Sequence, residues 1–168
     1  MSTRWLDEDE LVAWTRFIAV VELLPGVLEQ QLRRDSGLTH MEYMVLAMLS
    51  EAPDRTLRMS ALAARANASL PRLSHLTDRM EARGLVRRAP CAEDRRATNA
   101  TLTGAGWEVL RAAAPGHVET VRRHVLDPLT STQVRQLSQI SKTMLAAIDP
   151  SGTTAAPHQR RTAGEAPA

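Results

Sequence analysis

Residues 90–103 read PCAEDRRATNATLT and place two adjacent arginines, Arg95 and Arg96, directly behind two acids in a short polar segment. The flanking runs Leu85–Arg88 and Asn99–Leu102 have the composition and length of short strands. The stretch therefore predicts a β-hairpin with arginine at its tip. A charge run of this kind is also common in solvated surface loops, so the neighbouring segments have to decide what the hairpin does.

The segment directly before the hairpin, residues 70–83, is predicted to be an amphipathic helix. Ser69 can cap its start, Pro71 is tolerated in its first turn, and Gly84 is a suitable C-terminal stop. Its inward stripe is formed by Leu73, Leu76 and Met80. Arg72, Ser74, His75, Asp78 and Arg79 fall outside that stripe.

Further upstream, the sequence predicts two more helices and one possible strand. Thr39 and Glu42 have the spacing of a capping box, which begins a helix through Leu49. Residues 57–59 form a possible short strand, and residues 60–66 form a short helix with Ser60 as its N-cap. This order of elements is that of a winged helix-turn-helix: a helix, a short helix, a three-residue turn, an amphipathic helix and a hairpin. The predicted fold class is therefore mainly α with a small β-hairpin wing.

Long helical patterns flank this lobe at about residues 7–35 and 104–148, and each carries an apolar stripe. Pro25-Gly26 and Pro115-Gly116 predict a kink or a break in these patterns, and Thr130 with Gln133 predicts the start of the last helix. The stripes exceed what one small lobe can cover, which favours a homodimer that buries them against a second copy. An all-helical monomer that packs them internally is the alternative.

The predicted organisation is therefore a single folded unit with short flanking segments. Residues 1–6 are expected to be a flexible N-terminus, residues 7–148 the folded unit, and residues 39–103 its winged lobe. Residues 149–168 are small, polar and proline-dotted, which is typical of a disordered tail.

Charge is distributed unevenly along the chain. From Arg55 to Arg96 there are ten arginines and four acids, whereas residues 1–54 hold ten acids and four arginines. A basic centre between acidic flanks indicates a surface for a polyanion, although an arginine-rich helix facing water has the same composition. A helix of this kind fits the DNA major groove, and an arginine at a hairpin tip suits the adjacent minor groove.

Other classes of protein are less compatible with the sequence. The single cysteine, Cys91, fits a reducing compartment, and no stretch reaches the uninterrupted apolar length of a membrane span, so we expect a cytoplasmic protein. No nucleophile elbow or phosphate loop is present, so we expect no enzyme activity and no cofactor. The histidines His40, His117 and His124 are dispersed, so we expect no metal site.

The hairpin sequence Asp94-x-Arg96, followed after five residues by Leu102-Thr103, resembles the wing signature of MarR-type transcriptional regulators. The flanking RMEARGLVRR and LTGAGWEVL are similar to the family's usual continuation, and the resemblance extends from about residue 7 to residue 148. It implies a homodimer whose terminal helices interlock and whose two lobes bind a pseudo-palindromic DNA site. Such regulators commonly repress neighbouring genes and are released by small aromatic or amphipathic effectors, or by thiol oxidation.

The resemblance also implies roles for individual residues. DNA contacts from the recognition helix would fall on Ser69, Pro71, Arg72, Ser74, His75 and Arg79. Arg95 and Arg96 would be the wing contacts, and Asp94 would brace the wing through an ion pair. Leu70-Pro71 is more apolar than the polar pair often found at this helix start.

A ligand pocket in the family lies between the dimer helices and the DNA lobe, which makes Trp14 and Tyr43 candidate ligand contacts. A redox role for Cys91 is disfavoured, because no second cysteine is available to resolve a sulfenic acid. Besides a DNA-binding repressor, a winged-helix module that binds only proteins remains the alternative function. The retained Arg95-Arg96 tip favours DNA.

Overall fold

The computed structural model of the chain describes residues 2–92, 94 and 96–154. The elements in chain order are α1 (Glu8–Ser36), α2 (His40–Glu51), a short 3-10 turn (Pro53–Arg55), β1 (Thr56–Arg58), α3 (Met59–Arg65), α4 (Leu70–Ala82), β2 (Val86–Pro90), β3 (Thr98–Leu102), α5 (Gly104–Val121), a π-turn (Arg122–Leu126) and α6 (Ser131–Ile148). Arg95 and the predicted tail beyond residue 154 lie outside the described residues.

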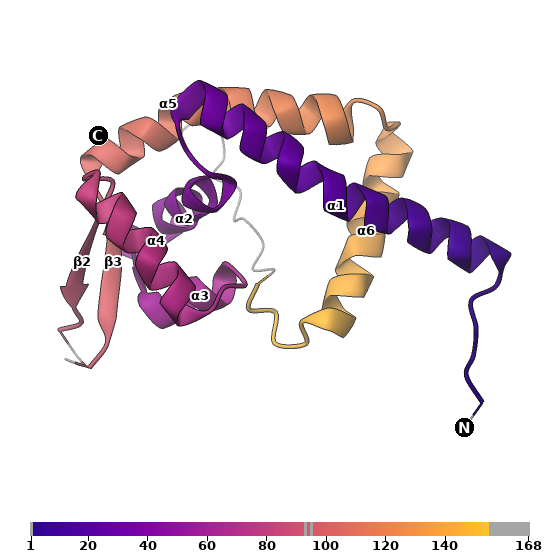
Figure 1. Cartoon of the computed structure of the whole chain (residues 1–168), viewed down its shortest axis with the longest axis horizontal. Helices are drawn as coiled ribbons and strands as arrows, with labels where there is room; N and C mark the ends of the chain where they lie inside the picture. Colours follow the sequence, from indigo (N-terminus) through magenta and orange to yellow (C-terminus); the bar gives the residue numbers. More distant parts are fainter. Residues whose placement is uncertain (1, 93, 95, 155–168) are drawn as a thin grey trace.

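The winged lobe consists of α2, α3, α4 and a three-stranded antiparallel sheet in the order β1-β3-β2 (Figure 1). The predicted hairpin is confirmed, with Val86 opposite Leu102 and Pro90 opposite Thr98. The short strand predicted at residues 57–59 is also present, one residue earlier, and pairs with β3. The side-chain hydroxyls of Thr56 and Thr101 lie 2.8 Å apart across this pair.

Side-chain caps define most of the helix starts. The capping boxes predicted at Thr39 and Thr130 are confirmed, and Asp7 with Glu10 forms a third that begins α1. The prediction of Ser60 as an N-cap is wrong, because β1 runs directly into α3 and Arg58 occupies the cap position without a side-chain hydrogen bond.

Neither helix is broken at its Pro-Gly pair, whereas a kink at these positions stays a prediction. Both α1 and α5 continue through Pro25 and Pro115. Each proline is exposed, so water can hydrate the carbonyl that has lost its helical donor, and the neighbouring turns remain hydrogen-bonded. The interruption instead lies after α5, where the chain widens into the π-turn before α6.

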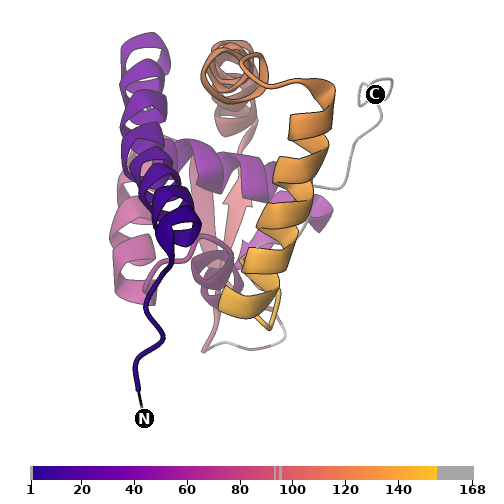
Figure 2. The same cartoon turned by 90° about the vertical axis from the view of Figure 1, so that its right-hand side faces the viewer.

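The core lies inside the winged lobe. Its fully buried side chains come from the C-terminal end of α1 and from the lobe's helices and sheet: Leu32, Leu38, Val45, Leu46, Leu49, Leu62, Leu73, Thr77, Met80 and Val86. Helices α1 and α5 pack side by side above α2, while α6 runs from the far end of α5 (Figures 1 and 2). The core therefore fixes the lobe and the adjoining part of α1 and α5.

The remaining apolar stripes are not covered by the chain itself. On α1, the exposed large apolar residues are Leu11, Val12, Trp14, Phe17, Val20, Val21 and Leu23. No residue of α6 is buried, and Leu137, Ile140, Leu145 and Ile148 are exposed. By length and composition alone, α1 could cross a membrane, with a mean hydropathy of 1.7 over 18 residues, although Arg16 and Glu22 interrupt its apolar run. Both helices present large apolar surfaces to solvent.

Candidate nucleic-acid interface

Helix α4 is fixed to the sheet by Arg88 on β2. The Arg88 guanidinium forms ion pairs with Asp78 and Glu81, and its backbone N–H donates to Glu81 at 2.7 Å. These hydrogen bonds from the Arg88 backbone and side chain hold the pKa of Glu81 below its usual value. Movement of the hairpin relative to the helix would break all of these contacts together.

A second ion pair joins the end of α4 to the start of α2. Arg83, at the C-cap of α4, lies 3.3 Å from the carboxylate of Glu42. Glu42 also accepts the backbone N–H of Thr39 at 2.8 Å, so one buried carboxylate serves as helix cap and as ion-pair partner. Ion pairs thus attach the C-terminal half of the helix at two points, while Leu73 and Leu76 anchor its N-terminal half in the core.

The outward face of α4 carries most of the residues that the sequence assigned to DNA contacts. Pro71, Arg72, His75 and Arg79 are exposed, and Ser74 is half-buried at the edge of this face. His75 lies 3.9 Å from Asp78. Among the residues that the structure describes, no ion pair engages the guanidinium of Arg72 or Arg79. Both cations are available to an anionic partner.

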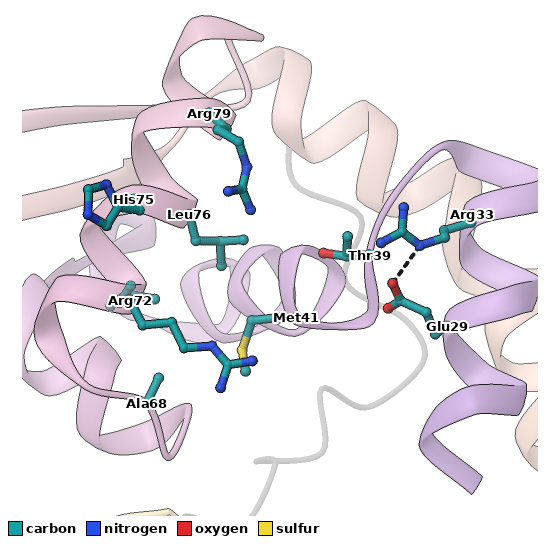
Figure 3. A pocket seen from close by; sticks show the side chains of 10 residues that line it. Glu29, Arg33, Thr39, Met41, Ala68, Arg72, His75, Leu76 and Arg79 are labelled. Atoms are coloured by element: carbon teal, nitrogen blue, oxygen red, sulfur yellow. Dashed lines mark hydrogen bonds and ion pairs between the residues drawn. The ribbon is translucent and has the colours of Figure 1, made fainter. Parts of the chain in front are cut away.

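A cleft of about 570 Å³ separates this face of α4 from the start of α2 and the end of α1 (Figure 3). Arg72 and Arg79 extend into it from α4, while Arg33 lies on the opposite side. Met41 and Leu76 contribute apolar walls, and Arg33 pairs with Glu29 at 2.5 Å. No sequence pattern predicted that Arg33, some forty residues before Arg72, would lie near α4.

The wing lies beside α4 at the end of the sheet (Figure 1). Arg96 is exposed, and its backbone N–H donates to the carboxylate of Asp94 at 3.1 Å. The same carboxylate lies 3.9 Å from the guanidinium of Arg58 on β1, at the outer limit of an ion pair. Asp94 thus contacts both the turn and the neighbouring strand, which is the geometry expected of a bracing residue.

The structure divides the arginines of the basic centre into two groups, which corrects the idea of a single basic face. Arg83 and Arg88 form ion pairs inside the lobe, and Arg55 lies 4.7 Å from the centre of the Trp107 ring. Arg72, Arg79 and Arg96 project outward instead. Composition cannot separate the groups, because pairing depends on which acids the fold brings close.

A second cleft, of about 580 Å³, lies between α2 and α5. Tyr43, Ala47, Trp107, Leu110, Ala114 and Val118 contribute to its lining. Of the two predicted ligand contacts, Tyr43 lies in this cleft. Trp14 does not line it, and is exposed on α1.

Tyr43 also belongs to an aromatic cluster that the sequence did not reveal. Its ring centre lies 4.3 Å from that of His117 on α5, and the rings of His117 and His40 stack at 6.2 Å. Burial lowers the pKa of both histidines, and the nearby charge of His40 lowers that of His117 further. The cluster joins α2 to α5, which is where the lobe meets the long helices.

Acidification is expected to weaken this junction. A histidine whose pKa is lower in the folded state stabilises the fold fully above its unfolded pKa of about 6.5, and loses that contribution as pH falls through the folded pKa. The free energy of unfolding should therefore decrease below about pH 6.5, as measured by urea denaturation across a pH series. His117→Gln should flatten the decrease, with the exposed His124→Gln as the matched control. An unchanged slope in His117→Gln would contradict this.

Cys91 is buried directly after β2, where the turn of the wing begins, and its Sγ lies 3.7 Å from the Arg58 guanidinium. Within the described part of the chain, no group of three or more potential ligands could hold a metal ion.

The exposed arginines on α4 and on the wing make the outward face of α4, with the wing beside it, the candidate site.

Comparison with known proteins identifies the same region. A model of the MarR family matches residues 36–97, which cover the winged lobe from the start of α2 to the wing. Sco3205, a MarR family transcriptional regulator from Streptomyces coelicolor solved in complex with DNA, is 43% identical, with a TM-score of 0.85 over 89% of this chain and 94% of Sco3205. AbsC, another MarR family regulator from that organism, is 40% identical, with a TM-score of 0.83 over 88% of this chain and 99% of AbsC.

A more distant relative is the transcriptional repressor MprA of Escherichia coli, 26% identical over 113 residues. That match covers 67% of this chain and 64% of MprA, slightly less than two thirds of the relative's length. The relatives are transcriptional regulators, and the similarity to Sco3205 and AbsC includes the long helices as well as the lobe. The chain, with its mainly helical fold and winged helix-turn-helix lobe, belongs to the MarR family of transcriptional regulators.

Proposed function

We propose that this protein is a homodimeric, sequence-specific DNA-binding repressor that responds to a small amphipathic effector. The observation that carries the proposal is the outward face of α4, where Arg72 and Arg79 lack an acidic partner among the described residues, with the exposed Arg96 on the adjacent wing. Arginine side chains in this arrangement can contact base edges in the major groove and phosphates or the minor groove beside it. The DNA in the Sco3205 complex supports this partner.

The dimer is inferred from the apolar surfaces of α1 and α6. Soluble monomers rarely expose contiguous apolar patches of this kind, and a second copy would cover both helices by two-fold symmetry. A two-fold dimer carries two α4 helices, which accounts for a pseudo-palindromic operator. Interlocked terminal helices also explain why α6 has no buried residue in a single chain. Sedimentation velocity should show a dimer. A monomer would instead favour an α1 whose apolar surface associates with a membrane.

Arginine substitutions test the DNA interface. Arg72→Ala should weaken operator binding by roughly 5- to 150-fold, because a base-contacting arginine contributes about 1–3 kcal/mol. Arg96→Ala should weaken it and also reduce the slope of log affinity against log salt by about 1, because an inserted arginine neutralises phosphate. Fluorescence anisotropy with a duplex selected by the protein from a random pool, at several salt concentrations, measures both.

The matched control is Arg135→Ala, which removes an exposed arginine on α6 away from the lobe. It should leave the affinity and the salt slope unchanged. Equal binding by wild type and Arg96→Ala at matched salt would remove the wing from the interface. Weak binding of the wild type to all sequences would instead favour the alternative function, a winged-helix module that binds proteins.

The cleft between α2 and α5 is the proposed effector site. Tyr43 provides a polar tip on a largely apolar wall, which suits a small aromatic molecule with one polar group. Such a molecule would bind where the lobe meets the long helices, so it could change the spacing of the two α4 helices. Release of bound DNA by small phenolic acids, lost in Trp107→Ala, is the test of this site. A ligand contact by Trp14 stays a prediction. Trp14 does not line this cleft in a single chain, so such a contact would require the second copy.

A further inference from the structure

The start of α4 exposes an apolar side chain at the point where a recognition helix approaches base edges. Leu70, the first residue of α4, is 49% exposed, and the adjacent Pro71 is exposed as well. It lies apart from the buried stripe of Leu73, Leu76 and Met80, so the core does not require it to be apolar. Exposed leucines are common on protein surfaces, so the surroundings of Leu70 must provide the argument.

The backbone at this helix start offers few donors to a phosphate. Pro71, the second residue of α4, has no N–H, and the N–H of Arg72 is donated to the Ser69 hydroxyl at 3.4 Å. Two of the first three backbone positions are therefore not free to hold an anion. This distinguishes the start of α4 from helix N-termini that bind phosphate through several free amides.

The charges around Leu70 nevertheless match DNA. Arg72 projects from the first turn of α4 (Figure 3), and the wing, which carries the exposed Arg96, lies beside the helix (Figure 1). Arg96 would contact phosphates or the minor groove beside the helix, and Arg72 would contact an adjacent base edge, while the N-terminal end of α4 faces the bases. The apolar feature that a base pair presents in the major groove is the C5-methyl group of thymine.

We propose that Leu70 and Pro71 form an apolar contact that reads thymine C5-methyl groups, so that a thymine in each operator half-site is selected through its methyl group. This inference rests on the proposed DNA-binding function and specifies how the α4 face distinguishes sequences. Leu70 is the residue that selects this thymine. Arg72 and Arg96 contribute to affinity through separate contacts.

Deoxyuridine substitution tests the contact, because deoxyuridine pairs like thymine but lacks the C5-methyl group. Each thymine of the duplex selected by the full-length protein is replaced in turn, and affinity is measured by anisotropy. One thymine in each half-site should show a loss of about fourfold, the value of one buried methyl group. Leu70→Ala should bind the unmodified duplex more weakly and should no longer distinguish thymine from deoxyuridine at that position.

Two further variants separate the contact from a general loss of binding. Leu70→Met keeps an apolar side chain and should retain the discrimination, whereas Arg72→Ala should bind both duplexes more weakly with the thymine preference unchanged. Tight binding with no thymine that discriminates, or discrimination that persists in Leu70→Ala, would overturn the inference and leave the proposed function intact. Failure of the wild type to select any duplex would overturn both.

Discussion

Ile140→Glu on α6 is expected to convert the protein to a monomer and to abolish operator binding. Ile140 is 56% exposed in the single chain, on the stripe that we assign to the partner subunit. In a two-fold dimer the substitution places two unpaired carboxylates in an apolar interface, each costing about 3–5 kcal/mol. The sum of about 6–10 kcal/mol would raise the dimer dissociation constant by a factor of 10⁴ or more.

Sedimentation velocity and anisotropy with the selected duplex measure the two consequences. Gln139→Glu is the matched control, because it adds the same charge to the opposite face of the same helix. It should remain dimeric and bind DNA normally. If Ile140→Glu stays dimeric, α6 is not part of the interface, and its stripe must be covered by another partner.

Gly106→Ala is expected to destabilise the junction between the lobe and α5. A Cβ at residue 106 would lie 2.0 Å from the carbonyl oxygen of Leu85 and 2.8 Å from a methyl carbon of Leu102. The carbonyl oxygen cannot retreat easily, because it accepts hydrogen bonds from the backbone N–H and the hydroxyl of Thr103. Relief of the clash therefore requires α5 to move away from the start of β2.

The expected cost is roughly 3 kcal/mol, at the upper end of the range for overpacking. For a chain of this length it corresponds to a decrease in Tm of about 10 °C, measured by thermal denaturation followed by circular dichroism. Gly104→Ala is the control, because nothing lies within 4 Å of a Cβ there and the residue begins the same helix. Equal stability of the two variants would show that the packing at Gly106 adapts.

Local signals in the sequence were sufficient for most of the secondary structure. The capping boxes at Thr39 and Thr130 and the N-cap at Ser69 are interactions within a few residues, so they can be read from the sequence. The two short strands of the hairpin were likewise recognised from the composition of contiguous runs. A break at Pro25 did not occur, and α5 also continues through Pro115, because a single lost hydrogen bond is tolerated within a long helix. The local capping signal was misleading at Ser60, where the preceding strand fixes the backbone.

The candidate site was predictable in its residue types and only partly in its geometry. Arg72, Arg79 and Arg96 lie outward as expected, because a helix period and a hairpin tip determine their direction. The pairing of Arg88 with Asp78 and Glu81, and the approach of Arg33 to the cleft beside α4, join separate elements. The position of Arg95 lies outside the described residues.

The sequence by itself determined the order of the elements, the winged lobe and the family, because these depend on local periodicity, capping and a contiguous wing motif. Only the tertiary structure decided which arginines form ion pairs within the lobe, that the His117 ring contacts those of Tyr43 and His40, and that Leu70 is exposed at the start of α4. Those outcomes depend on distances between side chains that are remote in the sequence. Packing alone sets such distances, and no local pattern encodes them.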